Sequence, residues 1–142
     1  MARTEYPCVG GSIPSLATTS LLIEFMIDQP RRGSIDDAAR CAEILNKWVE
    51  ITMWMPRLYS KNELLKMIEE AIPLRELWVI GNPALAYVSF NNDLSQVVAL
   101  YSDKPGRGYG KVLLDKVKEG REYIQLWSHS ANESAHRFYH RE

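Results

Sequence analysis

The chain has few cysteines, little net charge and no long hydrophobic run. Its two cysteines, Cys8 and Cys41, lie far apart and lack the spacing of metal ligands. Lys and Arg number 17 against 18 Asp and Glu, so no basic excess favours nucleic acid or an anionic membrane as a partner. No run of residues is long enough to span a membrane. We therefore expect a reduced, cytoplasmic protein without disulfides or bound metal.

The length of 142 residues suits a single domain with one hydrophobic core. Gly, Pro, Ser and Thr are frequent near the N-terminus, so we expect residues 1–21 to form a tail that need not be ordered. Residues 22–142 then form the domain, and its first strand is expected at Leu22–Asp28. A helix that Ser34 caps should follow, because acidic residues occupy its first turn and apolar residues recur at helical spacing.

Strands and helices are expected to alternate through the rest of the chain. Ser60 and Glu63 form a capping-box pattern, which predicts a second helix that ends before Pro73. Three short strands with tight polar connections predict an antiparallel meander at residues 76–80, 84–90 and 96–102. A helix at 111–120, a strand at 123–128 and a helix within 130–142 complete the pattern. The order β-α-α-β-β-β-α-β-α predicts an α/β fold with a mixed sheet, whose later crossover helix joins two parallel strands.

A glycine-rich turn joins the third strand of the meander to the following helix. Gly106, Gly108 and Gly110 alternate there, and glycine lets a ligand approach the main chain without a Cβ clash. Successive N–H groups and the positive end of the helix dipole form an anion site, to which Arg107 and Lys111 add charge. A structural hinge is the alternative explanation of the same glycines.

Two well-known phosphate-binding patterns do not fit this turn. A P-loop needs Ser or Thr after Gly-Lys, but Val112 follows Gly110 and Lys111. The dinucleotide fingerprint needs a third glycine where Lys111 stands, and the strand after the helix has no acidic residue at its end for a ribose.

From about Ile23 to Glu142 the chain resembles the GNAT superfamily of acetyl-CoA-dependent N-acyltransferases. Gly108 and Gly110 match the two glycines of the signature Arg/Gln-x-x-Gly-x-Gly/Ala, which follows the family's fourth strand. A second pattern, N-x-x-A-x-x-F-Y after the fifth strand, is matched by the residues Asn132, Ala135, Phe138 and Tyr139. Pro105 departs from the first signature, because it stands where the family has Arg or Gln.

The resemblance implies a fold in which strands four and five splay apart and acetyl-CoA enters the gap. It implies direct transfer of the acetyl group to a primary amine of a small molecule or peptide, with Tyr139 as the general acid. Trp54 and Arg57 are the expected substrate-binding residues, although ordinary packing also explains Trp54. The expected cofactor-binding residues are Leu100, Tyr101, Ser102, Gly106, Arg107, Gly108, Tyr109, Gly110, Lys111 and Asn132.

Some roles stay open at this stage. Asn132 suits a helix start as well as a cofactor contact. The general base is open between a water relay, Glu50 and His129. The alternatives to an active enzyme are a CoA-binding module impaired by Pro105 and a truncated, partner-dependent fragment.

The chain ends at Glu142, where the family continues with two more strands. Their loss predicts an exposed sheet edge at the strand expected at 123–128. A truncated gene product is the first interpretation. The alternatives are that another chain covers the edge, as in a homodimer, or that the N-terminal extension folds across it.

Overall fold

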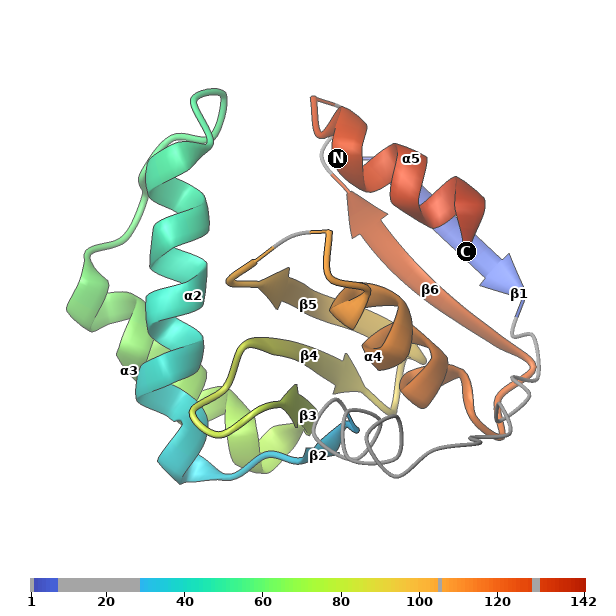
Figure 1. Ribbon diagram of the computed structural model, residues 1–142, viewed down its shortest axis with the longest axis horizontal. Coiled ribbons are helices and arrows are strands. Elements are labelled where there is room, and N and C mark those ends of the chain that lie inside the picture. Colours follow the sequence, from blue (N-terminus) through green and yellow to red (C-terminus); the bar gives the residue numbers. More distant parts are fainter. Residues whose placement is uncertain (1, 8–28, 105, 129–130) are drawn as a thin grey trace, which may run out of the picture.

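The computed structural model describes residues 2–7, 29–104, 106–128 and 131–142 (Figure 1). In this part of the chain, helices lie on both sides of a six-stranded sheet with the order β1-β6-β5-β4-β3-β2. The strands are β1 (Ala2–Pro7), β2 (Arg31–Arg32), β3 (Glu76–Ile80), β4 (Ala86–Asn91), β5 (Gln96–Ser102) and β6 (Tyr123–Ser128). The helices are α2 (Ala38–Ile51), α3 (Lys61–Ala71), α4 (Tyr109–Lys118) and α5 (Glu133–Arg141), with short 3₁₀ turns at Ile35–Asp37 and Ile72–Leu74.

The mixed α/β fold expected from the sequence is confirmed. β3, β4 and β5 form the antiparallel meander, and β5 and β6 pair in parallel across α4. The Ser60 hydroxyl accepts a hydrogen bond from the Glu63 N–H, and the Glu63 carboxylate accepts one from the Ser60 N–H, so the capping box of α3 is present. The strand expected at Leu22–Asp28 lies outside the described residues.

Two hydrophobic clusters fill the two faces of the sheet. One packs β4, β5 and β6 against Leu113, Leu114 and Val117 of α4. The other packs β3 and Tyr87 of β4 against α2, where Cys41 and Ile44 are fully buried. Alternation along each strand separates the two sets of side chains, so the sheet carries the helices on opposite faces.

β5 and β6 diverge soon after they meet. Their parallel pairing consists of Gln96 with Gln125 and Val97 with Leu126, although β5 runs on to Ser102. The rest of β5 remains paired with β4 on its other side. This is the splay expected from the family resemblance, and it opens one side of the β5 main chain.

The prediction that β6 forms an exposed edge of the sheet is wrong. β1 pairs with β6 in antiparallel fashion from Ala2 opposite Ser128 to Pro7 opposite Tyr123. Residues 2–7 therefore belong to the sheet rather than to a tail, as the N-terminal alternative proposed. A local sequence pattern does not predict this pairing, because the two strands lie near opposite ends of the chain.

An ion pair fixes the entry to α2 and gives the fold a dependence on acid pH. Arg31 donates two hydrogen bonds to the buried Asp37 carboxylate, at 3.1 and 2.7 Å. The hydrogen bond from Arg31 is the main cause of the lowered pKa of Asp37. A lowered carboxyl pKa stabilises the fold above the pKa of the unfolded chain, and this stability is lost as the pH falls toward the native pKa.

We predict that Asp37→Asn destabilises the protein by about 1–2 kcal/mol at pH 7, a value reduced for the solvent exposure of Arg31. The difference from the parent should shrink as the pH falls below about 4, where the parent carboxylate also takes up a proton. Urea unfolding from pH 7 to pH 3 measures both effects. The exposed neighbour Asp36 provides the control, Asp36→Asn, and a pH-independent loss in Asp37→Asn would contradict the assigned ion pair.

Candidate functional site

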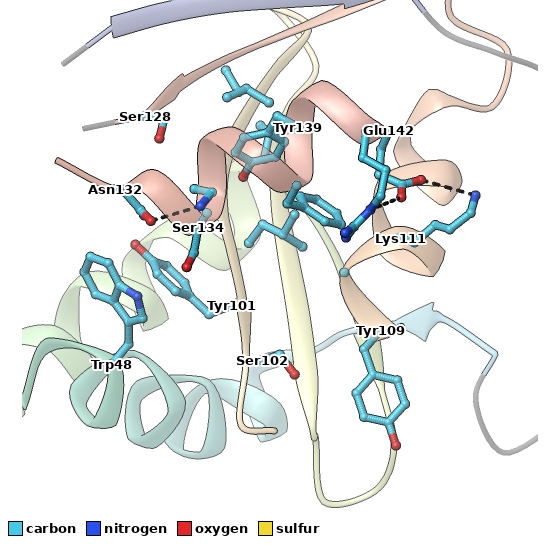
Figure 2. A pocket seen from close by; sticks show the side chains of 18 of the residues that line it. Trp48, Tyr101, Ser102, Tyr109, Lys111, Ser128, Asn132, Ser134, Tyr139 and Glu142 are labelled. Carbon is cyan, nitrogen blue, oxygen red and sulfur yellow. Dashed lines mark hydrogen bonds and ion pairs between the residues drawn. The ribbon is translucent and has the colours of Figure 1, made fainter. Parts of the chain in front are cut away.

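A cavity of about 770 Å³ lies where β5 and β6 diverge, which is a volume typical of small-molecule sites (Figure 2). Its wall is built from α2 and the following loop, β5, the glycine turn, the start of α4, the end of β6 and α5. The cavity brings together all ten expected cofactor-binding residues, together with Trp54 and Tyr139. Sequence reasoning did not select several other lining residues, among them Trp48, Lys104, Ser128, Ser134, Arg141 and Glu142.

The glycine turn presents its main chain to open space. Gly106 and Gly108 have φ angles of +86° and +81°, and Gly108 is the N-cap of α4. A Cβ placed at either glycine would meet no atom within 4 Å. The left-handed backbone explains why glycine stands at both positions, and the open space in front of it leaves room for an anion at the positive end of the helix.

Glycine is required at position 110 because of close packing and not because of the backbone conformation. Its φ is not positive, and a Cβ there would come within 3.3 Å of the Phe138 ring. The third glycine therefore lets α5 pack closely on the first turn of α4. Phe138 belongs to the partly buried rim of the core, as the packing explanation of this residue predicts.

The cations at the turn differ in their availability. Arg107 lines the cavity and is exposed. Lys111 pairs with Asp115 at 2.8 Å and with Glu142 at 3.5 Å, and the hydrogen bond to Asp115 is the main cause of its raised pKa. Two carboxylates already balance the Lys111 charge, which its place in the sequence did not indicate. Lys104 is a further exposed cation on the wall.

Two serine hydroxyls in the wall have no hydrogen-bond partner within the part of the chain that the structure describes. The Ser102 and Ser128 Oγ atoms are buried and unpaired, and Ser128 is only 6% exposed. A buried hydroxyl without a partner costs about 1–3 kcal/mol, so such groups are rare unless a ligand or water pairs with them. By strand alternation, Ser102 shares a face with Leu100 and Ser128 with Leu126, and both leucines pack in the cluster that α4 covers. The orphan hydroxyls thus stand on the two diverging strands and on the same side of the sheet.

Helix α5 places its matched motif on the cavity. The Asn132 side chain caps the helix by accepting a hydrogen bond from the Ala135 N–H at 3.1 Å, and the residue is part of the cavity wall. Asn132 is therefore a helix-start residue that also lines the site. Figure 2 shows Tyr139 on α5 between the side of the cavity with Ser128 and Asn132 and the side with Lys111 and Glu142. The Tyr139 and Phe138 rings meet edge to face, with their centroids 5.2 Å apart.

Of the two expected substrate-binding residues, only Trp54 lies on the cavity wall. Trp54 lines the cavity, and its ring meets that of Trp48 at 5.8 Å, nearly perpendicular. Arg57 is not among the lining residues, because its guanidinium donates hydrogen bonds to the Asn46 side chain at 2.6 Å and to the Tyr59 carbonyl at 3.0 Å. Glu50, one of the suggested bases, also lies off the described wall and is 3.8 Å from Arg57. His129 and Pro105 lie outside the described residues.

Within the described ranges, no helix is long and apolar enough to cross a membrane. The same residues bring together no group of three or more His, Cys, Asp or Glu side chains that could hold a metal ion.

The fold is similar to those of three solved structures, two of which are named as candidate acetyltransferases. A possible acetyltransferase from Clostridium difficile 630 superposes with a TM-score of 0.63 at 14% identity, over 80% of this chain and 87% of the other. Apo-form YjaB from Escherichia coli gives 0.62 at 20% identity, over 79% and 78%. A candidate acetyltransferase from Arthrobacter sp. FB24 gives 0.57 at 22% identity, over 79% and 81%. No family model matches the sequence, and no curated protein matches it significantly.

Because the Ser128 hydroxyl has no described partner, its removal should affect protein stability and ligand affinity in different ways. Ser128→Ala should leave the free energy of unfolding unchanged or raise it by about 1 kcal/mol, because no native hydrogen bond is lost. If the cavity binds CoA, as the family resemblance leads us to expect, the same change should weaken that binding by about fivefold to tenfold, the value of one hydrogen bond. Urea unfolding and titration calorimetry measure the two effects, with Ser89→Ala, a strand serine away from the cavity, as the control. A destabilised variant with unchanged CoA affinity would mean that the hydroxyl has a structural role.

Proposed function

We propose that this protein is an acyltransferase that transfers the acetyl group of acetyl-CoA to a primary amine. The observation that carries the proposal is the cavity between the diverging strands β5 and β6, with an open glycine turn at the start of α4 and two unpaired hydroxyls on its walls. The acetyltransferase-like structures with the same fold support the kind of reaction.

The residues of the cavity suit the parts of acetyl-CoA. The main chain of Gly106, Gly108 and Gly110 would hold the diphosphate, with Arg107 and Lys104 as nearby cations. The pantetheine arm carries two amides, and such groups pair well with a strand edge that its neighbour has left. The open side of β5 at Leu100, Tyr101 and Ser102 provides that edge.

In the proposed reaction, the nitrogen of a neutral amine attacks the thioester carbonyl carbon. A C–N bond forms, the C–S bond breaks, and CoA leaves as a thiolate. A β5 main-chain N–H facing the gap would stabilise the negative charge that develops on the carbonyl oxygen. Tyr139 would donate a proton to the departing sulfur and recover it from solvent.

The bound ammonium must lose one proton to become this neutral amine, and the nitrogen must lose a second proton as the C–N bond forms. Glu50 lies off the described cavity wall, so we propose that water in the cavity carries both protons to solvent. A chain that binds CoA and transfers nothing would instead be the impaired binding module, an alternative that the neutralised charge of Lys111 favours.

The first test adds a negative charge to the turn. We predict that Gly108→Glu raises the Kd for CoA by about 100-fold or more, since the new carboxylate would meet the phosphates at several kcal/mol of cost. Gly120→Glu is the matched control: Gly120 follows the other end of α4, also has a positive φ and has open space around it. Calorimetry should find nearly normal CoA affinity in that control. Equal losses in the two variants would trace the effect to backbone strain and remove the turn from the site.

The second test concerns the proposed acid. Tyr139→Phe should leave the Kd for CoA within about twofold and lower kcat by at least about tenfold, the low end for general acid catalysis because a thiolate leaves readily. Thiol release measured against acetyl-CoA and a panel of amines gives kcat, and calorimetry gives Kd. Tyr123→Phe, an exposed β6 tyrosine off the cavity wall, is the control. Unchanged turnover in Tyr139→Phe would exclude Tyr139 from the mechanism.

A further inference from the structure

One side of the cavity is aromatic and apolar. Trp48 of α2 lies between Trp54 and Tyr101, with ring centroids 5.8 Å from the first and 5.2 Å from the second. Met55 also lines the cavity, and the Tyr87 ring contacts the Tyr101 ring with their centroids 5.9 Å apart. We name the four lining residues Trp48, Trp54, Met55 and Tyr101 the aromatic wall.

The charged groups of the cavity belong to other elements. Among the described lining residues, the ionised side chains come from the glycine turn, α4 and α5, and none comes from α2 or the loop after it. Figure 2 shows Trp48 and Tyr101 on one side of the cavity and Lys111 with Glu142 on the other. Burial raises the pKa of Tyr101, so its phenol stays neutral over the physiological range. The aromatic wall therefore carries no formal charge.

We propose that the acceptor is a primary monoamine with an aromatic or apolar body and no acidic group. This inference rests on the proposed function, because it assigns the aromatic wall to the amine that acetyl-CoA would acetylate. Flat apolar rings bind another ring by stacking or edge contacts, and their faces attract an ammonium group. They hold that ammonium without a carboxylate, so the amine can still give up the proton that the reaction requires.

Other acceptor classes fit this wall less well. A polyamine or aminosugar carries several ammonium groups, and a site for it needs carboxylates that the wall lacks. An amino acid or acidic peptide carries a carboxylate, and Arg57, the cation expected to pair with it, is turned to Asn46 and Tyr59 instead. Leaving such charges unpaired in an apolar pocket is costly.

The test compares three amines in the presence of acetyl-CoA. 2-Phenylethylamine is the favoured probe, phenylalanine adds a carboxylate to the same body, and spermidine is a polyamine. We expect kcat/KM for 2-phenylethylamine to exceed that for each of the others by at least about tenfold, since unpaired charges in the wall oppose their binding. Equal or faster turnover of phenylalanine or spermidine overturns the inference and leaves the acetyltransferase function standing.

Binding without chemistry separates the inference from the proposed function. Quenching of tryptophan fluorescence by 2-phenylethylamine, with and without CoA, measures the binding of this amine. Trp54→Ala should raise the Kd of this amine by about tenfold, as loss of aromatic contacts predicts, while the Kd for CoA stays unchanged. Met53→Ala is the control, because Met53 adjoins Trp54 but is fully exposed and off the cavity wall. If 2-phenylethylamine binds through Trp54 but no amine is acetylated, the proposed acetyltransferase function is wrong and the proposed ligand preference of the aromatic wall holds. If 2-phenylethylamine neither binds nor is acetylated, the inference about the acceptor is wrong.

Discussion

The short pairing of β5 with β6 determines where a ligand can bind. Two residue pairs hold the strands together at one end, and beyond them the strands separate. Each strand keeps an outer neighbour: β5 pairs with β4 along its length, and β6 pairs with β1. The divergence therefore exposes one side of each strand without dissolving the sheet. Unpaired main-chain groups at such an opening favour a ligand that has amides of its own.

The glycine turn is held in place from both sides of the sheet. Before the turn, the Asp103 carboxylate pairs with Arg40 at 3.2 Å and with Lys47 at 3.0 Å, so the end of β5 is tied to α2. After the turn, the close approach of Phe138 to Gly110 ties α4 to α5. The open backbone between these anchors can thus be preorganised, which reduces the entropy that a bound phosphate must overcome. The hydrogen bond from Lys47 is the main cause of the lowered pKa of Asp103, so this anchor keeps its charge at neutral pH.

Local sequence patterns predicted the helices and strands well, but they did not predict several of the contacts between residues. The strands at 76–80 and 123–128 match β3 and β6, since apolar residues bounded by turn residues specify a strand locally. The glycine spacing also identified the turn. The pairing of β1 with β6 and the ion pair of Lys111 with Glu142 join segments that are far apart in the sequence. The direction of Arg57 depends on its hydrogen bonds to Asn46 and Tyr59, which helical or strand periodicity does not indicate. The unpaired hydroxyl of Ser128 could not be foreseen either, because a strand-end serine usually finds water or a backbone partner.

Helix α2 connects the core to the proposed acceptor site through one continuous stripe. Cys41, Ile44 and Trp48 recur at helical spacing on the face that meets the sheet. The first two are fully buried, whereas Trp48 is only partly buried and lies on the cavity wall. The lower burial of Trp48 is due to the sheet and not to the helix. β3 and β4 pack against the start of the stripe, whereas its far end faces the cavity between the separated strands β5 and β6. A residue that helical periodicity assigns to the core therefore lines a cavity where the opposite layer opens.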